Sequence, residues 1–178
     1  MLFRILTLFA ASTGISAQGW VQPRPWIVRA PITDARILGT LGAADANQIE
    51  AAKVAATKGN SKDVRVYAKL MVHDHEASFK ENTELAKRFR IARLLPDDST
   101  MARTHKQAMD SLNLLTGAAF DLAFLQATVS DHASLIKQIN TSLLPAAERK
   151  GIKNFVRGLL PMLSAHQAKG QELLDKQK

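Results

Sequence analysis

The sequence of 178 residues contains no cysteine. This absence excludes disulfide bridges, thiolate nucleophiles and thiolate metal ligands. Any metal site would therefore depend on histidine and carboxylate side chains. The usual motifs of hydrolases and of phosphate-binding loops are also missing: no G-x-S-x-G, no H-E-x-x-H and no glycine-rich phosphate loop occurs. We therefore expect a protein that is not an enzyme.

Aromatic residues make up only 6% of the chain, while alanine and leucine are abundant. This balance favours helices over strands. No alternating apolar pattern and no Asn-Gly turn signal suggests a β-hairpin. The content of 46% hydrophobic and 22% charged residues is that of an ordinary globular domain.

No apolar run is long enough to span a bilayer comfortably, but the first residues resemble a secretory signal. Arg4 gives a positive start, Ile5 to Ala11 is a short apolar stretch, and small residues end at Ala17. We expect a signal peptide at 1–17, cleaved after Ala17, and export to the periplasm or the outer membrane. An extended leader at 18–33, with three of the six prolines and both tryptophans, should precede a helical domain at 34–178.

The chain is basic, and cleavage would remove one arginine and no acidic residue, which lowers the net charge from +8 to +7. The basic residues are scattered, with no cluster that has interleaved aromatics, so we expect no nucleic acid as a partner. A basic exported protein could instead bind an anionic membrane surface or an envelope polymer.

The periodicity of apolar residues predicts five helices, four long and one short. The first begins at Asp34 or Ala43 and ends at Lys58, and the second follows Ser61 and reaches about Ala92. A short helix ends near Leu115, and two long helices cover about 116–143 and 146–177. Short turns at each end and a long link in the middle predict an all-α four-helix bundle, ferritin-like, whose crossover contains the short helix.

Three histidines fall on the inward stripes of three of these helices: His75, His132 and His166. The first two close the similar stretches "MVHDH" and "TVSDH", and the third closes "LLPMLSAH". The other two, His73 and His105, are expected on the surface. Unpaired imidazoles are poor core residues, so three that converge on one interior need a metal, a ligand or a mutual network.

These motifs resemble those of the domain-of-unknown-function family 4142. The resemblance rests on Glu50 in the first helix, Met71 with Asp74 and His75, Phe120 with Asp121, Asp131 with His132, and Leu160-Pro161 with His166. It covers about 35–174 and implies export, an all-helical bundle of the ferritin-like type, and an envelope or stress role.

A di-iron centre of the usual ferritin type is not expected, because it needs a Glu three residues before a His. Val72, Val129 and Leu163 occupy those positions here.

Three interpretations of the histidines stay open. The first is a purely structural Asp–His network, the second is a pH sensor, and the third is a site for one zinc, copper, nickel or iron ion. In the metal interpretation the ligands are Glu50, His75, His132 and His166, and the supporting carboxylates that orient the rings are Asp74, Asp121 and Asp131. The sequence favours an exported, non-enzymatic bundle with an internal Asp/His cluster, and leaves metal binding and membrane binding as alternatives.

Overall fold

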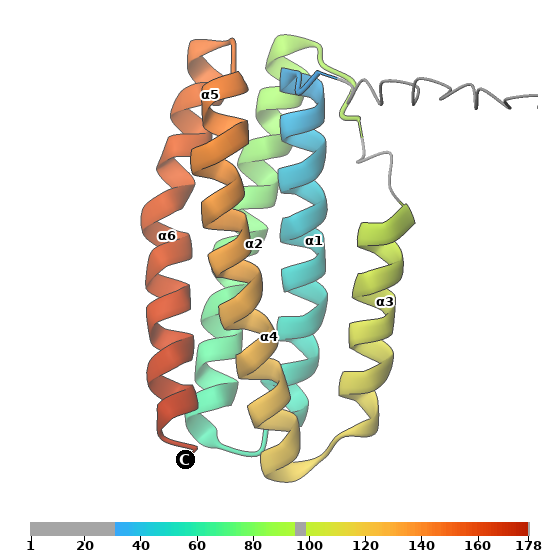
Figure 1. Cartoon of the computed structure of the whole chain (residues 1–178), viewed down its shortest axis with the longest axis vertical. Helices are drawn as coiled ribbons and strands as arrows, with labels where there is room; N and C mark the ends of the chain where they lie inside the picture. Colours follow the sequence, from blue (N-terminus) through green and yellow to red (C-terminus); the bar gives the residue numbers. More distant parts are fainter. Residues whose placement is uncertain (1–30, 95–98, 178) are drawn as a thin grey trace, which may run out of the picture. The chain divides into compact units, whose positions relative to one another are not determined.

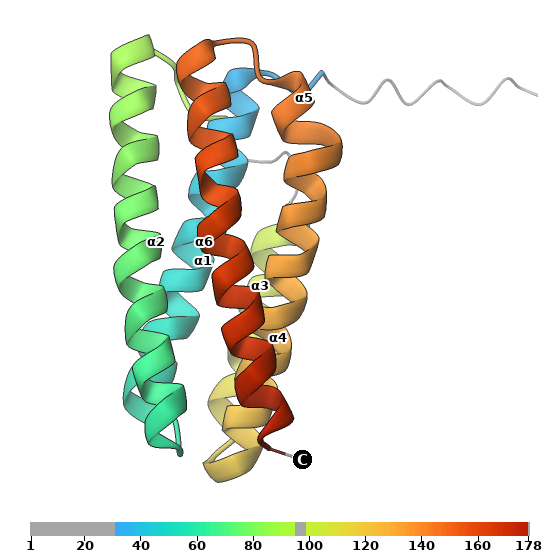
Figure 2. The same ribbon diagram turned by 90° about the vertical axis from the view of Figure 1, so that its left-hand side faces the viewer.

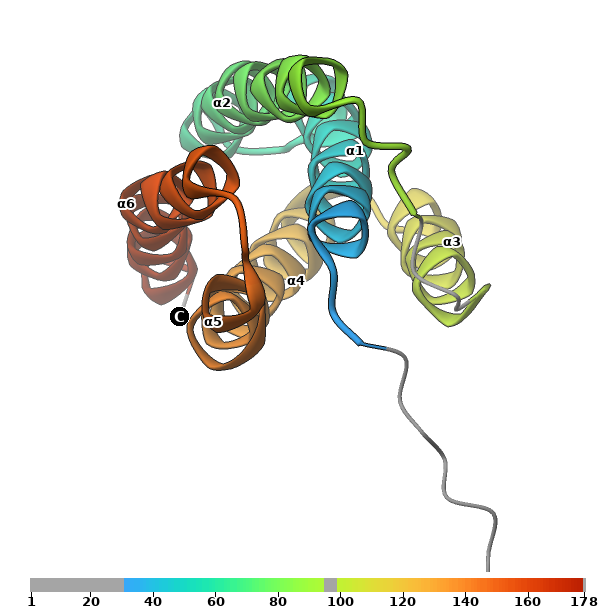
Figure 3. The same cartoon turned by 90° about the horizontal axis from the view of Figure 1, so that it is seen from above.

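The computed structural model describes residues 31–94 and 99–177, and within these ranges all regular structure is helical. Four long helices lie side by side and a shorter one, α3, lies outside them (Figures 1 and 3). The elements are α1 (Asp34–Lys58), α2 (Lys62–Phe89), α3 (Ser99–Leu114), α4 (Gly117–Gln138), the π-helical turn η1 (Ile139–Leu143), α5 (Leu144–Ala146) and α6 (Lys150–Asp175). The predicted all-α bundle is confirmed. The signal peptide expected at 1–17 and residues 18–30 of the leader lie outside the described residues.

The connections between the helices also follow the prediction. A short turn joins α1 to the antiparallel α2, and another corner joins α4 to the antiparallel α6 (Figures 1 and 2). Helix α3 runs back along the bundle between α2 and α4, so these two long helices point in the same direction (Figure 1). This is the crossover of a ferritin-like bundle, and it contains the short helix.

The turn between α1 and α2 is fixed by side chains that accept hydrogen bonds from its backbone. Ser61 caps α2, because its hydroxyl accepts from the amide of Val64 at 3.1 Å. The buried carboxylate of Asp121, on α4, accepts from the amides of Asn60 and Ser61 at 2.8 and 2.7 Å. Asp121 therefore holds the turn before α2 against α4. It does not orient one of the histidine rings, the role expected for it from the sequence.

Helix α6 begins later in the chain than predicted. Sequence periodicity placed the start near Ala146, but α6 begins at Lys150. The buried carboxylate of Asp34 accepts from the backbone amides of Glu148 and Arg149, and its second oxygen binds the Arg149 guanidinium at 2.8 Å. These bonds hold both residues in a non-helical turn against the start of α1.

The core of the bundle is divided into two apolar clusters. One cluster contains Leu38, Leu41 and Leu163, and the other contains Met71 and Phe124. Between them, each long helix contributes buried polar side chains to a single layer: Asp45, Gln48, His75, Ser78, Thr128, His132 and His166. Burying polar groups in a helical core costs free energy unless they are satisfied, so this layer is the part of the fold that requires a functional explanation.

Within the part of the chain that the structure describes, no helix combines the length and the hydropathy needed to cross a bilayer.

Candidate metal centre

The three histidines reach the same level of the bundle from three different helices. His75 lies on the buried stripe of α2, one turn after Met71 and one turn before Ser78. His132 lies on the buried face of α4, one turn after Thr128, and His166 on that of α6. Their exposed fractions are 1%, 2% and 2%. The predicted convergence of the three rings is therefore what the structure shows.

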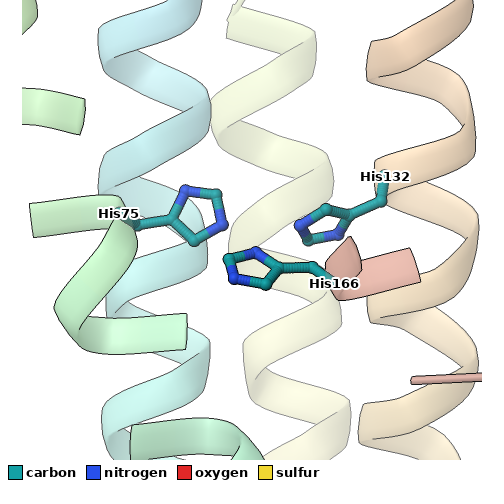
Figure 4. A group of neighbouring side chains, drawn as sticks. All are labelled: His75, His132 and His166. Carbon is teal, nitrogen blue, oxygen red and sulfur yellow. The ribbon is translucent and has the colours of Figure 1, made fainter. Parts of the chain in front are cut away.

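The rings form a nearly regular triangle. The ring centroids of His75 and His132 are 5.5 Å apart, those of His75 and His166 are 5.3 Å apart, and those of His132 and His166 are 5.5 Å apart. One nitrogen from each ring lies within 4.8 Å of the other two. Figure 4 shows the three rings turned toward a common centre.

The orientation of the His75 ring is fixed from its outer side. Its Nδ1 lies 2.8 Å from a carboxylate oxygen of Asp45, on α1. The second oxygen of Asp45 accepts a hydrogen bond from the Ser78 hydroxyl at 2.7 Å. With Asp45 as the acceptor, Nδ1 of His75 carries the proton and Nε2 carries a lone pair.

The tautomer of His132 is fixed by the backbone. Its Nδ1 lies 2.8 Å from the carbonyl oxygen of Thr128, one turn earlier in the same helix. A carbonyl oxygen can only accept, so Nδ1 is the protonated nitrogen and Nε2 of His132 is again a bare lone pair.

The ring of His166 is hydrogen-bonded through Nε2, whereas His75 and His132 are bonded through Nδ1. Its Nε2 lies 2.9 Å from Asp74 on α2, whose other oxygen lies 2.9 Å from Nδ1 of the exposed His73. Burial alone would raise the pKa of Asp74, but the hydrogen bonds from His73 and His166 outweigh it and the pKa is lowered. The ionised Asp74 accepts from Nε2, which leaves Nδ1 of His166 without a proton. Asp74 thus orients a histidine on a neighbouring helix, the role that the sequence analysis proposed for it.

Three nitrogens consequently face the centre of the triangle with no hydrogen-bond partner among the described residues: Nε2 of His75, Nε2 of His132 and Nδ1 of His166. Each is an acceptor and none of the three can donate to another. Buried acceptors without a partner each cost about 1–3 kcal/mol. Three of them directed at one point is the arrangement that a cation satisfies.

Burial favours the neutral form that a metal ligand needs in two of the rings, those of His132 and His166. Burial lowers the pKa of His132 to about 4, against a hydrogen bond to the Thr128 carbonyl that raises it, and His75 and His166 lower it further. Burial likewise lowers the pKa of His166, in spite of the opposing effect of Asp74. At neutral pH both lone pairs are therefore available.

The dimensions of the triangle fit a single ion after a small adjustment. Metal–nitrogen bonds of about 2.0–2.1 Å at tetrahedral angles place ligand nitrogens about 3.3 Å apart. The nitrogens here lie within 4.8 Å of one another, so side-chain rotation would have to bring them somewhat closer together to reach that spacing.

Glu50 is not part of this group. Its side chain is 60% exposed and its carboxylate lies 2.9 Å from Nε2 of His105, on α3. His105 is 18% exposed through this contact, less than the sequence analysis expected, whereas His73 is 81% exposed. Asp131, expected to orient a histidine, accepts instead from the amide of Gln48 at 3.1 Å.

The carboxylate that sequence reasoning missed is Asp45. Among the buried residues of α1, one row has alternating spacings of four and three residues along the whole helix: Asp34, Leu38, Leu41, Asp45, Gln48, Ala52 and Ala55. Asp45 lies in the middle of this row and Glu50 lies off it. Applying the periodicity of α1 to its acidic residues would have selected Asp45.

A cavity of about 450 Å³ connects this centre with the surface. It lies between α1 and α4 and is bordered by α3. His75 and His132 form its inner wall, while Thr104, Ala108 and Ser134 are exposed at its outer side. His166 does not line it. The centre is therefore buried but reachable, and the cavity opens on the side of the triangle that faces away from His166.

The fold and this centre define a class of protein, an all-helical bundle with a polar layer of three histidines inside it. The sequence profile of the domain of unknown function DUF4142 matches residues 28–173. The chain belongs to the DUF4142 family, as its motifs predicted.

Solved structures of the protein CopM share the fold. The Cu(II)-bound form of CopM is 17% identical, with a TM-score of 0.66 over 83% of this chain and 99% of that chain. The Cu(I)-bound form is 16% identical with a TM-score of 0.66, and the Ag-bound form is 17% identical with a TM-score of 0.64; each covers 81% of this chain and 96% of the other. At this level of identity the similarity establishes the fold alone. A comparison with curated protein sequences finds no match.

Proposed function

We propose that this protein binds one transition-metal ion through Nε2 of His75, Nε2 of His132 and Nδ1 of His166. The observation that carries the proposal is the convergence of these three unpartnered lone pairs in a buried layer. A purely structural network would use both nitrogens of each ring, because an unsatisfied buried acceptor destabilises the fold. Here each ring is bonded on its outer side and left open on its inner side.

The outer contacts have the form that metal-binding histidines need. Asp45 and Asp74 accept from the far nitrogens of His75 and His166, and the Thr128 carbonyl does so for His132. Such partners fix the tautomer and the direction of the lone pair, and carboxylates increase the basicity of the ligand. The two carboxylates also offset the charge of a divalent ion.

Among first-row divalent ions, copper is the first to test. Three imidazoles suit zinc, copper, nickel and iron, and within this series Cu(II) binds a given nitrogen site most tightly. That the same fold holds copper and silver in CopM is consistent with this choice. Met71, one turn before His75, packs in the apolar cluster that contains Phe124 and is not assigned as a ligand.

The test is a metal titration of the purified protein by calorimetry and elemental analysis, with Cu(II), Zn(II) and Ni(II) in parallel. We expect one ion per chain, and loss of this ion in His132→Leu and in His166→Leu. The matched control is His105→Leu, which removes a histidine outside the triangle and should leave the stoichiometry at one. Binding that survives the first two variants would overturn the proposal.

We also propose that the protein acts outside the cytoplasm, on the basis of the amino-terminal pattern around Arg4 and Ala17. Mass spectrometry of the protein from a cell envelope fraction tests this: a chain that begins at Gln18 supports export with cleavage, and an intact chain in the cytoplasm contradicts it.

A further inference from the structure

The cavity beside the three histidines is larger than entry of an ion requires. Its volume of about 450 Å³ lies in the range of pockets that hold small molecules, about 300–1,000 Å³. It reaches the nitrogen triangle along one edge only, that between His75 and His132.

Three protein ligands leave a tetrahedral ion with one open position. The edge between His75 and His132 borders the cavity, whereas His166 approaches from the opposite side, on α6. In Figure 4, α3 lies behind the rings in the gap between the helices that flank them. In the proposed centre the open position would therefore face the cavity.

The chemistry of the wall indicates what can occupy this space. Uncharged amide and hydroxyl groups contributed by α1, α3 and α4 dominate the polar part of the wall: Asn47, Gln48, Thr104, Ser134 and Gln138. No lysine or arginine lines the cavity among the described residues, and Asp131 does. An anion would meet the carboxylate of Asp131 and no lysine or arginine, and the His105 ring in the wall already contacts the Glu50 carboxylate. A neutral molecule finds both donors and acceptors.

We propose, on the basis of the proposed metal centre, that the cavity binds a small neutral molecule. A donor atom of this molecule takes the remaining coordination position of the ion. The ligand enters between α1 and α4 past Ala108, binds the metal beside His75 and His132, and hydrogen-bonds to the amide side chains of the wall.

The experiment uses the Cu(II)-loaded full chain with imidazole as the neutral probe and azide as the anionic one. Binding is followed by the Cu(II) absorption and electron paramagnetic resonance spectra. We expect imidazole to change both spectra with a saturable dependence and to bind more tightly than azide. Spectra that imidazole leaves unchanged, or that azide changes at lower concentration, would overturn the proposal.

Two variants test the route through the cavity. Ala108→Phe places a large side chain at its outer side, and Ala102→Phe makes the same change at an exposed position of α3 that does not line it. We expect Ala108→Phe to weaken imidazole binding about ten-fold or more, equivalent to about 1.4 kcal/mol, with the copper stoichiometry still at one. Ala102→Phe should bind imidazole as the parent does.

Equal imidazole affinity in Ala108→Phe would show that the ligand reaches the metal by another path. That outcome would overturn the proposed ligand site alone. Failure of the metal centre would appear earlier, as absent or histidine-independent copper binding before any imidazole is added, and would overturn both proposals.

Discussion

Replacing His132 by leucine should make the metal-free protein more stable and at the same time abolish metal binding. His132 is the appropriate position because of what surrounds it. Among the described residues its one hydrogen bond is to the Thr128 carbonyl, within helix α4. The substitution therefore leaves no buried charge without a partner, in contrast to His75→Leu, which would strip Asp45 of its imidazole.

The magnitude follows from the unpartnered nitrogen. Nε2 of His132 is a buried acceptor with no partner, and its removal should recover about 1–3 kcal/mol in the metal-free protein at neutral pH. For a chain of this size each kcal/mol raises the melting temperature by roughly 2–4 °C. Leucine has a similar volume and continues an apolar face, so no large cavity term opposes the gain.

The assay is thermal and urea unfolding followed by circular dichroism, with a chelator and with Cu(II). With the chelator, His132→Leu should melt above the parent protein. With free copper at about a hundred times its Kd, the parent should gain about 2.7 kcal/mol and the variant nothing, so that the advantage of the variant shrinks or reverses. If the variant is less stable than the parent in chelator by about 2 kcal/mol or more, the His132 ring stabilises the metal-free bundle. That result would contradict the claim that its unpartnered Nε2 costs stability.

Three further predictions concern other side chains. Because the pKa of His132 falls from 6.5 to about 4 on folding, the unfolded chain binds more protons between these values. Through this group the metal-free protein should lose about 3 kcal/mol of stability as the pH falls from 6.5 to 4. Urea midpoints should show a smaller loss in His132→Leu than in the parent, because the variant keeps the lowered pKa of His166 and lacks only the contribution of His132. Asp45→Asn should weaken copper binding about 10–100-fold while Glu50→Gln leaves it unchanged, as measured by calorimetry, and the reverse order would restore Glu50 as a ligand. Asp34→Asn should lower the stability by about 1–3 kcal/mol, because it weakens the bonds to the corner before α6, with unchanged copper affinity; an effect on affinity would mean that the corner positions the site.

Much of the fold could be predicted because its signals are local. Ser61 marks the start of α2 in the sequence and caps it in the structure, and the stripe through Met71 and His75 faces inward as its periodicity requires. The start of α6 could not be predicted in this way. It depends on Asp34, more than a hundred residues earlier, which binds the amides of Glu148 and Arg149.

The candidate site could likewise be predicted only in part. The three histidines could be predicted, because each lies on the apolar stripe of its own helix. The residues that bind their outer nitrogens could not be assigned by proximity in the sequence. Asp74 accepts a hydrogen bond from His166 on another helix, and Asp131 accepts one from Gln48. Glu50 was favoured through a family motif, although the periodicity of α1 turns it outward and turns Asp45 inward.

The most direct test of the metal centre is a crystal structure of the copper-loaded protein with an anomalous difference map at the copper edge. We expect one strong peak about 2.0–2.1 Å from Nε2 of His75, Nε2 of His132 and Nδ1 of His166. A peak on the surface of the bundle, with the three inner nitrogens still facing each other without an ion, would contradict it.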